Sequence, residues 1–418
     1  DHRDLHSFPT RRSSDLATSA LSNDGTINLS ADDAVAAFAN TGTLNGSPYT
    51  LTAATYALNN GSIINANLGS GVVTANGAVQ LNGASSAETF HVQTGTTTLG
   101  AAERLLDSTD LTVDALATLI LGGTEKIGSL FGAGVVNVNA GEFTIDDGNF
   151  SGVVYGASTA NGLTKVSSGA LTLSGANTYA GPTNVNAGTL DLTGSLTGSV
   201  VNVAGGATLN DVAAGLADGT VLTANGTVNL SADETIDQLF GSGSVHLAAA
   251  LTVSSGDFSG VVSADNATYE LFKVSSGTLT LSGANTYTGA TETAAGTLNL
   301  TGSLASQNVH VASGATLNDV NGGLHSASTL SNDGTVNLSA DDAVSTFAST
   351  GTLNGSSYTL TAATYALNNG SVINANLGAG VVTANGTVQL NGASGAEIVN
   401  IASGTTTLGS AERLLDSA

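Results

Sequence analysis

The sequence predicts an all-β protein, folded as a right-handed parallel β-helix (a β-solenoid) with about 19 residues per coil. Three observations support this fold class: a repeat of 19 residues, an alternation of apolar and polar residues within the repeat, and a composition rich in turn-forming residues. The aliphatic member of a Thr-Leu or Thr-Val dipeptide recurs every 19 positions, at Leu279, Leu298, Leu317 and Val336, and earlier at Leu171, Leu190, Leu209 and Val228. One such repeat buries too little apolar surface to fold alone, so the repeats are expected to stack.

The alternation within one repeat predicts a half-buried strand. In the segment GTLTL, Leu279 and Leu281 fall on one face, while Thr278 and Thr280 fall on the other. Gly, Asn and Ser in the following SGANTYTG segment tolerate the backbone angles of tight corners. If successive strands pair in parallel register, equivalent leucines stack about 4.8 Å apart, and some 400 residues in about 20 coils extend to roughly 100 Å. Crossovers between parallel strands are nearly always right-handed, which gives the predicted hand.

The same register predicts two outward rows of polar residues. One row is formed by Thr297, Thr316 and Thr335, and the other by Asn299, Asn318 and Asn337. Stacked Asn side chains hydrogen-bond to one another along such an axis and hold the register, although a ligand-binding ridge is the alternative. Asp319 occupies a position where Leu300 predicts an inward apolar residue. We therefore expect its coil to turn early.

Three segments have features of helices. SADDAVAAFANTG from Ser30 and SADETIDQLFGSG from Ser231 begin with a Ser cap and an acidic first turn, and the second has apolar residues at helical spacing. Both are short and end in Gly, so we favour strand-and-corner variants of the coil over helices. AERLLDS, at Ala102 and again at Ala411, is the third segment and allows one helical turn outside the coil.

Longer repeats organise the chain into one continuous predicted domain, residues 17–418. Residues 21–108 return as 330–417 at an offset of 309, and residues 165–262 are related to 273–351. We see no change of composition that marks a linker or a domain boundary. Ala418 ends inside a repeated unit, so we expect any anchor to lie beyond it.

Residues 1–16, DHRDLHSFPTRRSSDL, resemble the in-frame translation of a common sequencing-library adapter. We therefore predict a non-native, disordered segment and exclude it from the fold, so that the natural chain enters at about Ala17. The alternative is a short basic targeting arm built on Arg3, Arg11 and Arg12.

The charge balance excludes several kinds of partner. The chain has 8 Lys and Arg against 32 Asp and Glu, a net charge of -24, which residues 1–16 do not change because their three Asp and three Arg cancel. Such an acidic surface repels phosphate backbones and anionic lipids, so we expect no nucleic-acid binding. No run of 18 apolar residues is present, so we expect no membrane insertion by a helix. The absence of Cys excludes disulfides and is compatible with export.

Two segments carry a family resemblance: LTLSGANTYAGPTNVNAGTLDLTGSL from Leu171 and LTLSGANTYTGATETAAGTLNLTGSL from Leu279. They are similar to the passenger-associated strand repeats of Gram-negative autotransporters, and a looser likeness covers most of residues 100–340. The resemblance implies a secreted β-helical passenger, which a C-terminal outer-membrane barrel moves across the outer membrane and anchors at the bacterial cell surface. We expect this barrel outside residues 1–418.

The search for reactive groups gives no catalytic, cofactor-binding or metal-binding residues. Paired acids occur at Asp32 with Asp33, Asp146 with Asp147, Asp233 with Glu234, and Asp341 with Asp342. Glycoside hydrolysis needs two carboxylates across one cleft, but pairs copied between repeats are more simply solvated turns. His91, His246, His310 and His325 lack metal-ligand spacing, and are interpreted as surface or corner residues. Tyr179 and Tyr287 in GANTY either pack at a corner or stack on sugar rings.

The acidic turns are possible calcium sites, because acidic repeat proteins often bind calcium. The SNDGT turns at Ser22 and Ser331 and the IDDGN turn at Ile145 offer oxygen ligands, but neither the helix-loop motif nor the calcium-binding nonapeptide is present.

The sequence thus predicts a non-catalytic passenger segment, a rigid β-helical stalk or adhesin scaffold that presents a distal region for an unidentified receptor. A β-helical polysaccharide-degrading enzyme is one alternative. Tandem β-sandwich repeats of a calcium-dependent adhesin, suggested by the unit of about 108 residues, are the other.

Overall fold

Every regular element in residues 18–409, the part of the chain that the computed structural model describes, is a β-strand. The chain divides into two units, residues 1–200 and 201–418. Unit 1 contains β1 (Ala20–Asn23), β2 (Thr26–Asn28), β3 (Asp33–Asn40), β4 (Thr43–Asn45), β5 (Thr50–Leu58), β6 (Ser62–Ile64), β7 (Asn67–Leu68), β8 (Val72–Asn76), β9 (Val79–Leu81), β10 (Thr89–Leu99), β11 (Asp110–Val113), β12 (Ala117–Ile120), β13 (Glu125–Gly132), β14 (Val135–Asn137), β15 (Phe143–Phe150), β16 (Val153–Gly156), β17 (Leu163–Lys165), β18 (Ala170–Leu173), β19 (Ala176–Tyr179), β20 (Thr183–Val185), β21 (Thr189–Leu192) and β22 (Ser195–Leu196).

At the division lies β23 (Val200–Val203). Unit 2 then contains β24 (Thr208–Asp211), β25 (Val221–Ala224), β26 (Thr227–Leu230), β27 (Glu234–Gly241), β28 (Ser244–Leu247), β29 (Leu251–Phe258), β30 (Val261–Ala264), β31 (Leu271–Lys273), β32 (Thr278–Leu281), β33 (Ala284–Asn285), β34 (Thr291–Thr293), β35 (Thr297–Leu300), β36 (Ser303–Leu304), β37 (Asn308–Val311), β38 (Thr316–Asp319), β39 (Thr329–Asn332), β40 (Thr335–Leu338), β41 (Asp342–Ser349), β42 (Thr352–Asn354), β43 (Thr359–Leu367), β44 (Val372–Ile373), β45 (Asn376–Leu377), β46 (Val381–Leu390) and β47 (Ile398–Leu408).

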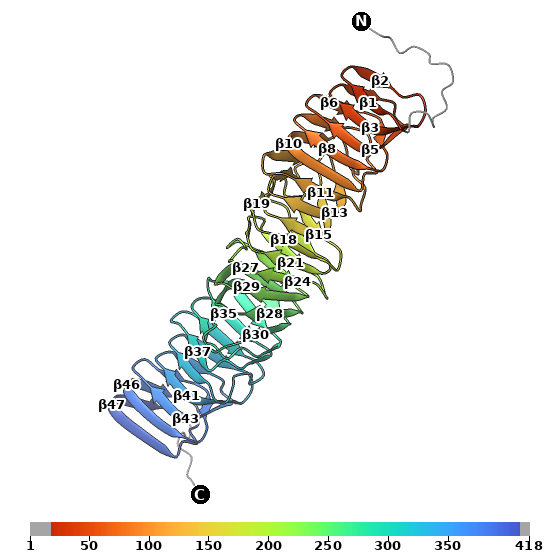
Figure 1. Ribbon diagram of the computed structural model, residues 1–418. Helices are drawn as coiled ribbons and strands as arrows, with labels where there is room; N and C mark the ends of the chain where they lie inside the picture. The colour runs from red at the N-terminus through yellow and green to blue at the C-terminus, as the bar shows by residue number, and fades with distance from the viewer. Residues whose placement is uncertain (1–17, 410–418) are drawn as a thin grey trace. The chain divides into compact units, whose positions relative to one another are not determined.

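Within each unit, the strands pair in parallel with strands one coil away, and the coils stack on one another (Figure 1). In unit 1, Leu171 pairs with Leu190, and both are fully buried. In unit 2, the register joins Leu279, Leu298, Leu317 and Val336, all fully buried. The predicted β-solenoid is confirmed. A β-sandwich is built from antiparallel sheets, so the alternative of tandem β-sandwich repeats is wrong.

Coil length varies more than the 19-residue repeat predicts. Asn23 pairs with Asn40, 17 positions further on, whereas Gly148 pairs with Leu171, 23 positions further on. The solenoid tolerates this range because extra residues lie in the corners, where they leave the strand register unchanged. Continuity of a single β-helix over residues 17–418 stays a prediction. The predictions for residues 1–16 concern a segment outside the described residues.

The segments with helical features are strands. The Ser30 segment contains β3, and the Ser231 segment contains β27. In β27, Ile236 and Leu239 both face the core, although they are three positions apart. A corner separates them, where the backbone N–H groups of Asp237 and Gln238 both donate to the carbonyl oxygen of Thr220, at 3.0 and 3.2 Å. AERLLDS at Ala102 forms bends and turns without a helix, and its second copy at Ala411 lies outside the described residues.

The outward asparagine row is a hydrogen-bonded ladder in unit 2. Nδ2 of Asn318 donates to Oδ1 of Asn299 at 2.6 Å, and Nδ2 of Asn337 donates to Oδ1 of Asn318 at 2.7 Å. Asn354 and Asn374 extend the ladder with bonds of 2.9 and 2.8 Å. Each rung joins one coil to the next, so the predicted hydrogen bonding along the row is confirmed.

Replacing Asn318 by Asp tests the ladder. The carboxylate has no N–H to donate to Asn299 and faces its amide oxygen, so we expect a loss of about 1–2 kcal/mol in the free energy of unfolding. Thr316→Ala, on the same outward face, is the control, with an expected change within about 0.5 kcal/mol. Urea denaturation followed by circular dichroism measures both. Equal stability of the two variants would contradict the role of the ladder.

Candidate functional site

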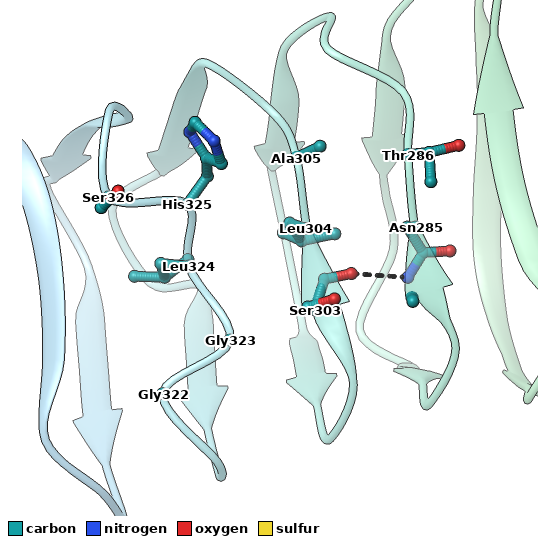
Figure 2. A pocket seen from close by; sticks show the side chains of 11 residues that line it. Asn285, Thr286, Ser303, Leu304, Ala305, Gly322, Gly323, Leu324, His325 and Ser326 are labelled. Atoms are coloured by element: carbon teal, nitrogen blue, oxygen red, sulfur yellow. Dashed lines mark hydrogen bonds between the residues drawn. The ribbon is translucent and has the colours of Figure 1, made fainter.

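A shallow groove of about 410 Å³ lies on the surface of unit 2. It crosses three consecutive coils, which contribute residues 284–286, 303–305 and 322–326 (Figure 2). β33 and β36 form two of the walls through a pairing of their own, separate from the main sheet. The third wall is an irregular loop, residues 320–328, between β38 and β39. We call it the groove loop.

Asn285 joins the coils beneath the groove. Its buried Nδ2 donates to the carbonyl oxygens of Gly283 and Ser303, both at 3.1 Å, and its Oδ1 accepts a hydrogen bond of 3.0 Å from the backbone N–H of Val262. Figure 2 shows the link to Ser303. Asn177 makes the same set of bonds in unit 1, to Val154, Gly175 and Ser195. The Asn of GANTY is therefore a structural bridge across three coils.

The Tyr of GANTY is a core residue. The hydroxyl of Tyr287 lies 2.6 Å from Oγ1 of Thr291, and the side chain is fully buried. Tyr179 bonds Thr183 in the same way at 2.7 Å. Burial raises the pKa of both phenols above their usual range. The packing interpretation is confirmed, and stacking of these rings on sugars is wrong.

The groove itself offers hydrogen-bonding groups but only one ionisable side chain among its lining residues, His325. Nδ1 of His325 accepts a hydrogen bond of 3.2 Å from the backbone N–H of Ala327, which requires an unprotonated Nδ1. Thr286, Ser303 and Ser326 provide hydroxyls. The lining thus has no pair of carboxylates of the kind that glycoside hydrolysis requires.

Beneath the groove loop lies a pair of acidic residues, Asp319 and Asp342. Oδ1 of Asp319 accepts a hydrogen bond of 2.9 Å from the N–H of Gly323, and Oδ2 of Asp342 accepts one of 3.0 Å from the N–H of Leu324. The expected early turn at Asp319 is wrong. Asp319 belongs to β38 in register with Leu300 and is fully buried, because its carboxyl group binds the loop that follows the strand.

The same arrangement recurs 108 positions earlier, with Asp211 and Glu234. Oδ1 of Asp211 accepts a hydrogen bond of 2.8 Å from the N–H of Gly215, in the loop that follows β24. Burial and the neighbouring Asp211 raise the pKa of Glu234 to about 9. Burial and the neighbouring Asp342 raise the pKa of Asp319 to about 7.

Unit 1 has a single buried carboxyl group at the corresponding place. Glu125, the first residue of β13, accepts hydrogen bonds from the N–H groups of Arg104 (2.9 Å) and Leu105 (2.8 Å) in the AERLLDS segment. Burial raises its pKa to about 7. Neither Glu125 nor Asp211 was predicted from the sequence. The available signal for Glu125 was an acidic residue at the start of four long strands, β3, β13, β27 and β41.

The paired acids of the sequence analysis separate into two kinds. In three of the four pairs the first member is exposed and binds the next coil: Oδ1 of Asp32, Asp233 and Asp341 accepts a backbone N–H from Thr50 (2.9 Å), Ala250 (3.0 Å) and Thr359 (2.7 Å). The turn interpretation fits these three. It is wrong for Glu234, which is buried, whereas Asp146 and Asp147 are half-buried and Asp147 accepts a hydrogen bond from Ser129 at 2.8 Å.

Three histidines lie half-exposed on the surface, as predicted, but each has an acidic partner. The closest N···O distances are 2.8 Å for His91 and Asp114, 3.2 Å for His246 and Asp265, and 3.1 Å for His310 and Asp333. In residues 18–409, no group of three or more His, Asp or Glu side chains is arranged to hold a metal ion. At the SNDGT turn from Ser331, the side chains of Thr350 and His310 lower the pKa of Asp333.

Two buried lysines hold corners of the coils. Nζ of Lys273 donates to the carbonyl oxygens of Val274 (2.6 Å), Ser275 (2.9 Å) and Ala295 (3.0 Å). Lys165 donates to Ser167 and Ala187 in unit 1. Both side chains are fully buried, and burial lowers the pKa of both ammonium groups.

Comparison with known families identifies these repeats. Residues 163–192 and 271–303 match the passenger-associated-transport-repeat model. The matched segments contain both buried lysines and both GANTY units. No curated protein and no solved structure matches the chain. Residues 18–409 contain no helix that could span a membrane.

Proposed function

We propose that this chain is a non-catalytic passenger segment of a Gram-negative autotransporter, a β-solenoid scaffold that is exported and displayed at the cell surface. The observation that carries the proposal is the pair of passenger-associated transport repeats within a parallel β-solenoid. The residues that the two matched segments share serve the fold: the Asn bridge and the buried Lys join consecutive coils, and the buried Tyr packs in the core. These residues stabilise the solenoid, so its outer surface is available to present a binding region.

Parallel stacking suits a chain that emerges from a membrane in sequence order. Each coil pairs with the coil before it, so a newly exported coil finds a complete template, and folding propagates along the chain. Because the chain has no Cys, it cannot form a disulfide bond that would hold it folded before export. The partner implied is a C-terminal outer-membrane translocator. A distal binding region would be presented by the scaffold to a receptor on another surface.

Surface display gives a direct test. The full chain is placed between a signal peptide and an autotransporter barrel in a Gram-negative host, and intact cells are labelled with antibody and treated with external protease. We expect surface labelling that the protease removes, and none when the barrel is deleted. Retention in the periplasm, while the same barrel exports an unrelated short passenger, would contradict the proposal.

The scaffold role has a separate test. Purified chain is incubated with a panel of acidic, neutral and host-type polysaccharides, and reducing ends and unsaturated products are measured. We expect no product above the buffer control. Turnover of any polysaccharide would favour the alternative of a β-helical degrading enzyme.

A further inference from the structure

The two acidic pairs of unit 2 leave buried oxygen atoms without hydrogen bonds. These atoms are Oδ2 of Asp211, Oε2 of Glu234 and Oδ2 of Asp319. Asp211 and Asp319 are at least 99% buried and Glu234 is 97% buried. The other oxygen of Asp211 and of Asp319 already accepts a backbone N–H. A buried carboxylate oxygen with no donor is strongly unfavourable, so each pair needs a hydrogen that the backbone does not supply.

Among residues 18–409, no cation interacts with these carboxyl groups. The groups that interact with Asp319 are Asp342, from β41, and the N–H groups of Gly322 and Gly323; its register partners on β35 and β40 are Leu300 and Leu338.

Glu234 likewise interacts with Asp211, from β24, and with the N–H groups of Thr235 and Leu216, and it pairs with Leu251 of β29. The exposed neighbours Asp233 and Asp341 are engaged with the next coil. Within the described part of the chain, the ionisable group that interacts with Asp319 or Glu234 is therefore another carboxyl group.

We propose that each pair, Asp211 with Glu234 and Asp319 with Asp342, binds one shared proton, and that this proton fastens the loop that follows β24 or β38. The proton sits on one of the orphan oxygens, which donates an O–H···O bond to the partner carboxylate. In the second pair, the two oxygens of Asp342 accept the N–H groups of Ala343 (2.7 Å) and Leu324 (3.0 Å), so Asp342 carries the charge and Oδ2 of Asp319 carries the proton. The ligand is a proton and not a metal ion, because the N–H groups of Gly215, Gly323 and Leu324 point at these carboxyl groups and repel a cation.

The pKa shifts of the two buried carboxyl groups have the sign that a shared proton requires. The pKa values of about 9 for Glu234 and about 7 for Asp319 lie above the ordinary values of 4.5 and 3.8. The folded chain therefore retains a proton that the unfolded chain releases. The resulting stability is complete below pH 4 and is lost as the pH rises to about 7 at Asp319 and to about 9 at Glu234. Above these values each pair carries two negative charges that repel each other. Both members of the first pair are buried, whereas in the second pair Asp319 is buried and Asp342 is half-buried.

Loss of the shared proton affects the surface groove, because the groove loop is bound to the Asp319 and Asp342 carboxyl groups. Gly323 and Leu324 line the groove and are held by the Asp319 and Asp342 carboxyl groups (Figure 2). Loss of the shared proton pushes these carboxyl groups apart and releases the loop. The shape of the groove is therefore coupled to pH: it is fixed in acidic surroundings and loose in alkaline ones.

Local hydrogen exchange tests the proposal on the full chain. Exchange of peptides covering residues 320–328 is measured by mass spectrometry at pH 6 and pH 9 and corrected for the intrinsic rate of exchange. We expect protection of the wild-type groove loop to fall at least tenfold between the two pH values. In Asp319→Asn, whose amide supplies the hydrogen at every pH, we expect a change of less than threefold. Asp341→Asn, the exposed neighbour, is the matched control and keeps the wild-type response.

Three outcomes would overturn the proposal: wild-type protection that is the same at pH 6 and pH 9, an equal fall in Asp319→Asn, or protection at pH 9 that calcium restores and a chelator removes. The last outcome identifies a cation site. If Asp319→Asn fails to fold, Asp319→Leu, which continues the apolar column of Leu300 and Leu338, carries the same expectation of a pH-independent loop. A local measurement is required because Glu125 in unit 1 changes global stability with the same sign.

Discussion

Lys273→Ala is expected to lower the free energy of unfolding of unit 2 by about 3–5 kcal/mol. The ammonium group of Lys273 is fully buried and donates to the carbonyl oxygens of Val274, Ser275 and Ala295. Alanine leaves these acceptors without a donor and leaves a cavity where the aliphatic stem packed. Urea denaturation followed by circular dichroism measures the loss, since the chain has no Trp to report on it.

Lys273→Met separates the two contributions. Methionine restores most of the apolar volume but no donor, so we expect it to recover about 1–2 kcal/mol of the loss and no more. Lys126→Met, which removes a half-exposed lysine paired with Asp107 at 3.2 Å, is the surface control, and its expected change is at most about 1 kcal/mol. Full recovery by methionine would show that the hydrogen bonds of the ammonium group contribute nothing to stability.

The parts of the fold that were predictable from the sequence are those with a strict spatial period. Leu279 and Leu298 stack, and Asn299 and Asn318 bond, because a parallel register converts a sequence repeat directly into a column of like residues. Alternation with a period of two then assigns each column to the core or to the surface. Neither step requires knowledge of the corners.

The conformation of the corners could not be predicted from the sequence. Ile236 and Leu239 have the spacing of a helix face because a corner turns the chain between them, so that both point into the core. A pattern of i and i+3 does not distinguish a helix from a strand that bends around one corner of a coil. Only indirect features of the segment argued against a helix: it is short, and its repeat partners fit strands.

The buried charges were missed for a related reason. Asp319 interrupts a leucine column, which indicates a departure from the coil when charged residues are assumed to stay in water. In the structure Asp319 is the last residue of β38 and keeps the register with Leu300, and the irregular groove loop supplies N–H donors that make burial of Asp319 tolerable. Those donors belong to a segment with no repeat pattern, so their position was not predictable from periodicity. Lys273 is the same case with the opposite charge. Its buried ammonium group is surrounded by carbonyl oxygens of the corners, whereas the carboxyl group of Asp319 is surrounded by N–H groups.

Tyr287→Ala is expected to produce a loss of similar size to Lys273→Ala, about 3–5 kcal/mol in the free energy of unfolding. The ring is fully buried, and its hydroxyl bonds Oγ1 of Thr291 at 2.6 Å, so alanine creates both a cavity and an unpaired hydroxyl. Tyr287→Phe keeps the ring and removes only the hydrogen bond, with an expected loss of about 1 kcal/mol. Urea denaturation gives both values.

Tyr358, which is 37% exposed, is the matched control in the same unit, and Tyr358→Ala is expected to change stability by about 0.5 kcal/mol or less. Comparing Tyr287→Ala with Tyr358→Ala also distinguishes a tyrosine that packs in the core from one that binds a surface ligand. A tyrosine that served a surface ligand would be replaceable without loss of stability, as is expected of Tyr358. If Tyr287→Ala were as stable as Tyr358→Ala, the ring would not be part of the core, and the GANTY units would have to be reconsidered as a surface for ligands. A large loss at Tyr287 alone assigns the repeat motif to holding coils together, as the fold requires of a scaffold whose stability is built from contacts between neighbours.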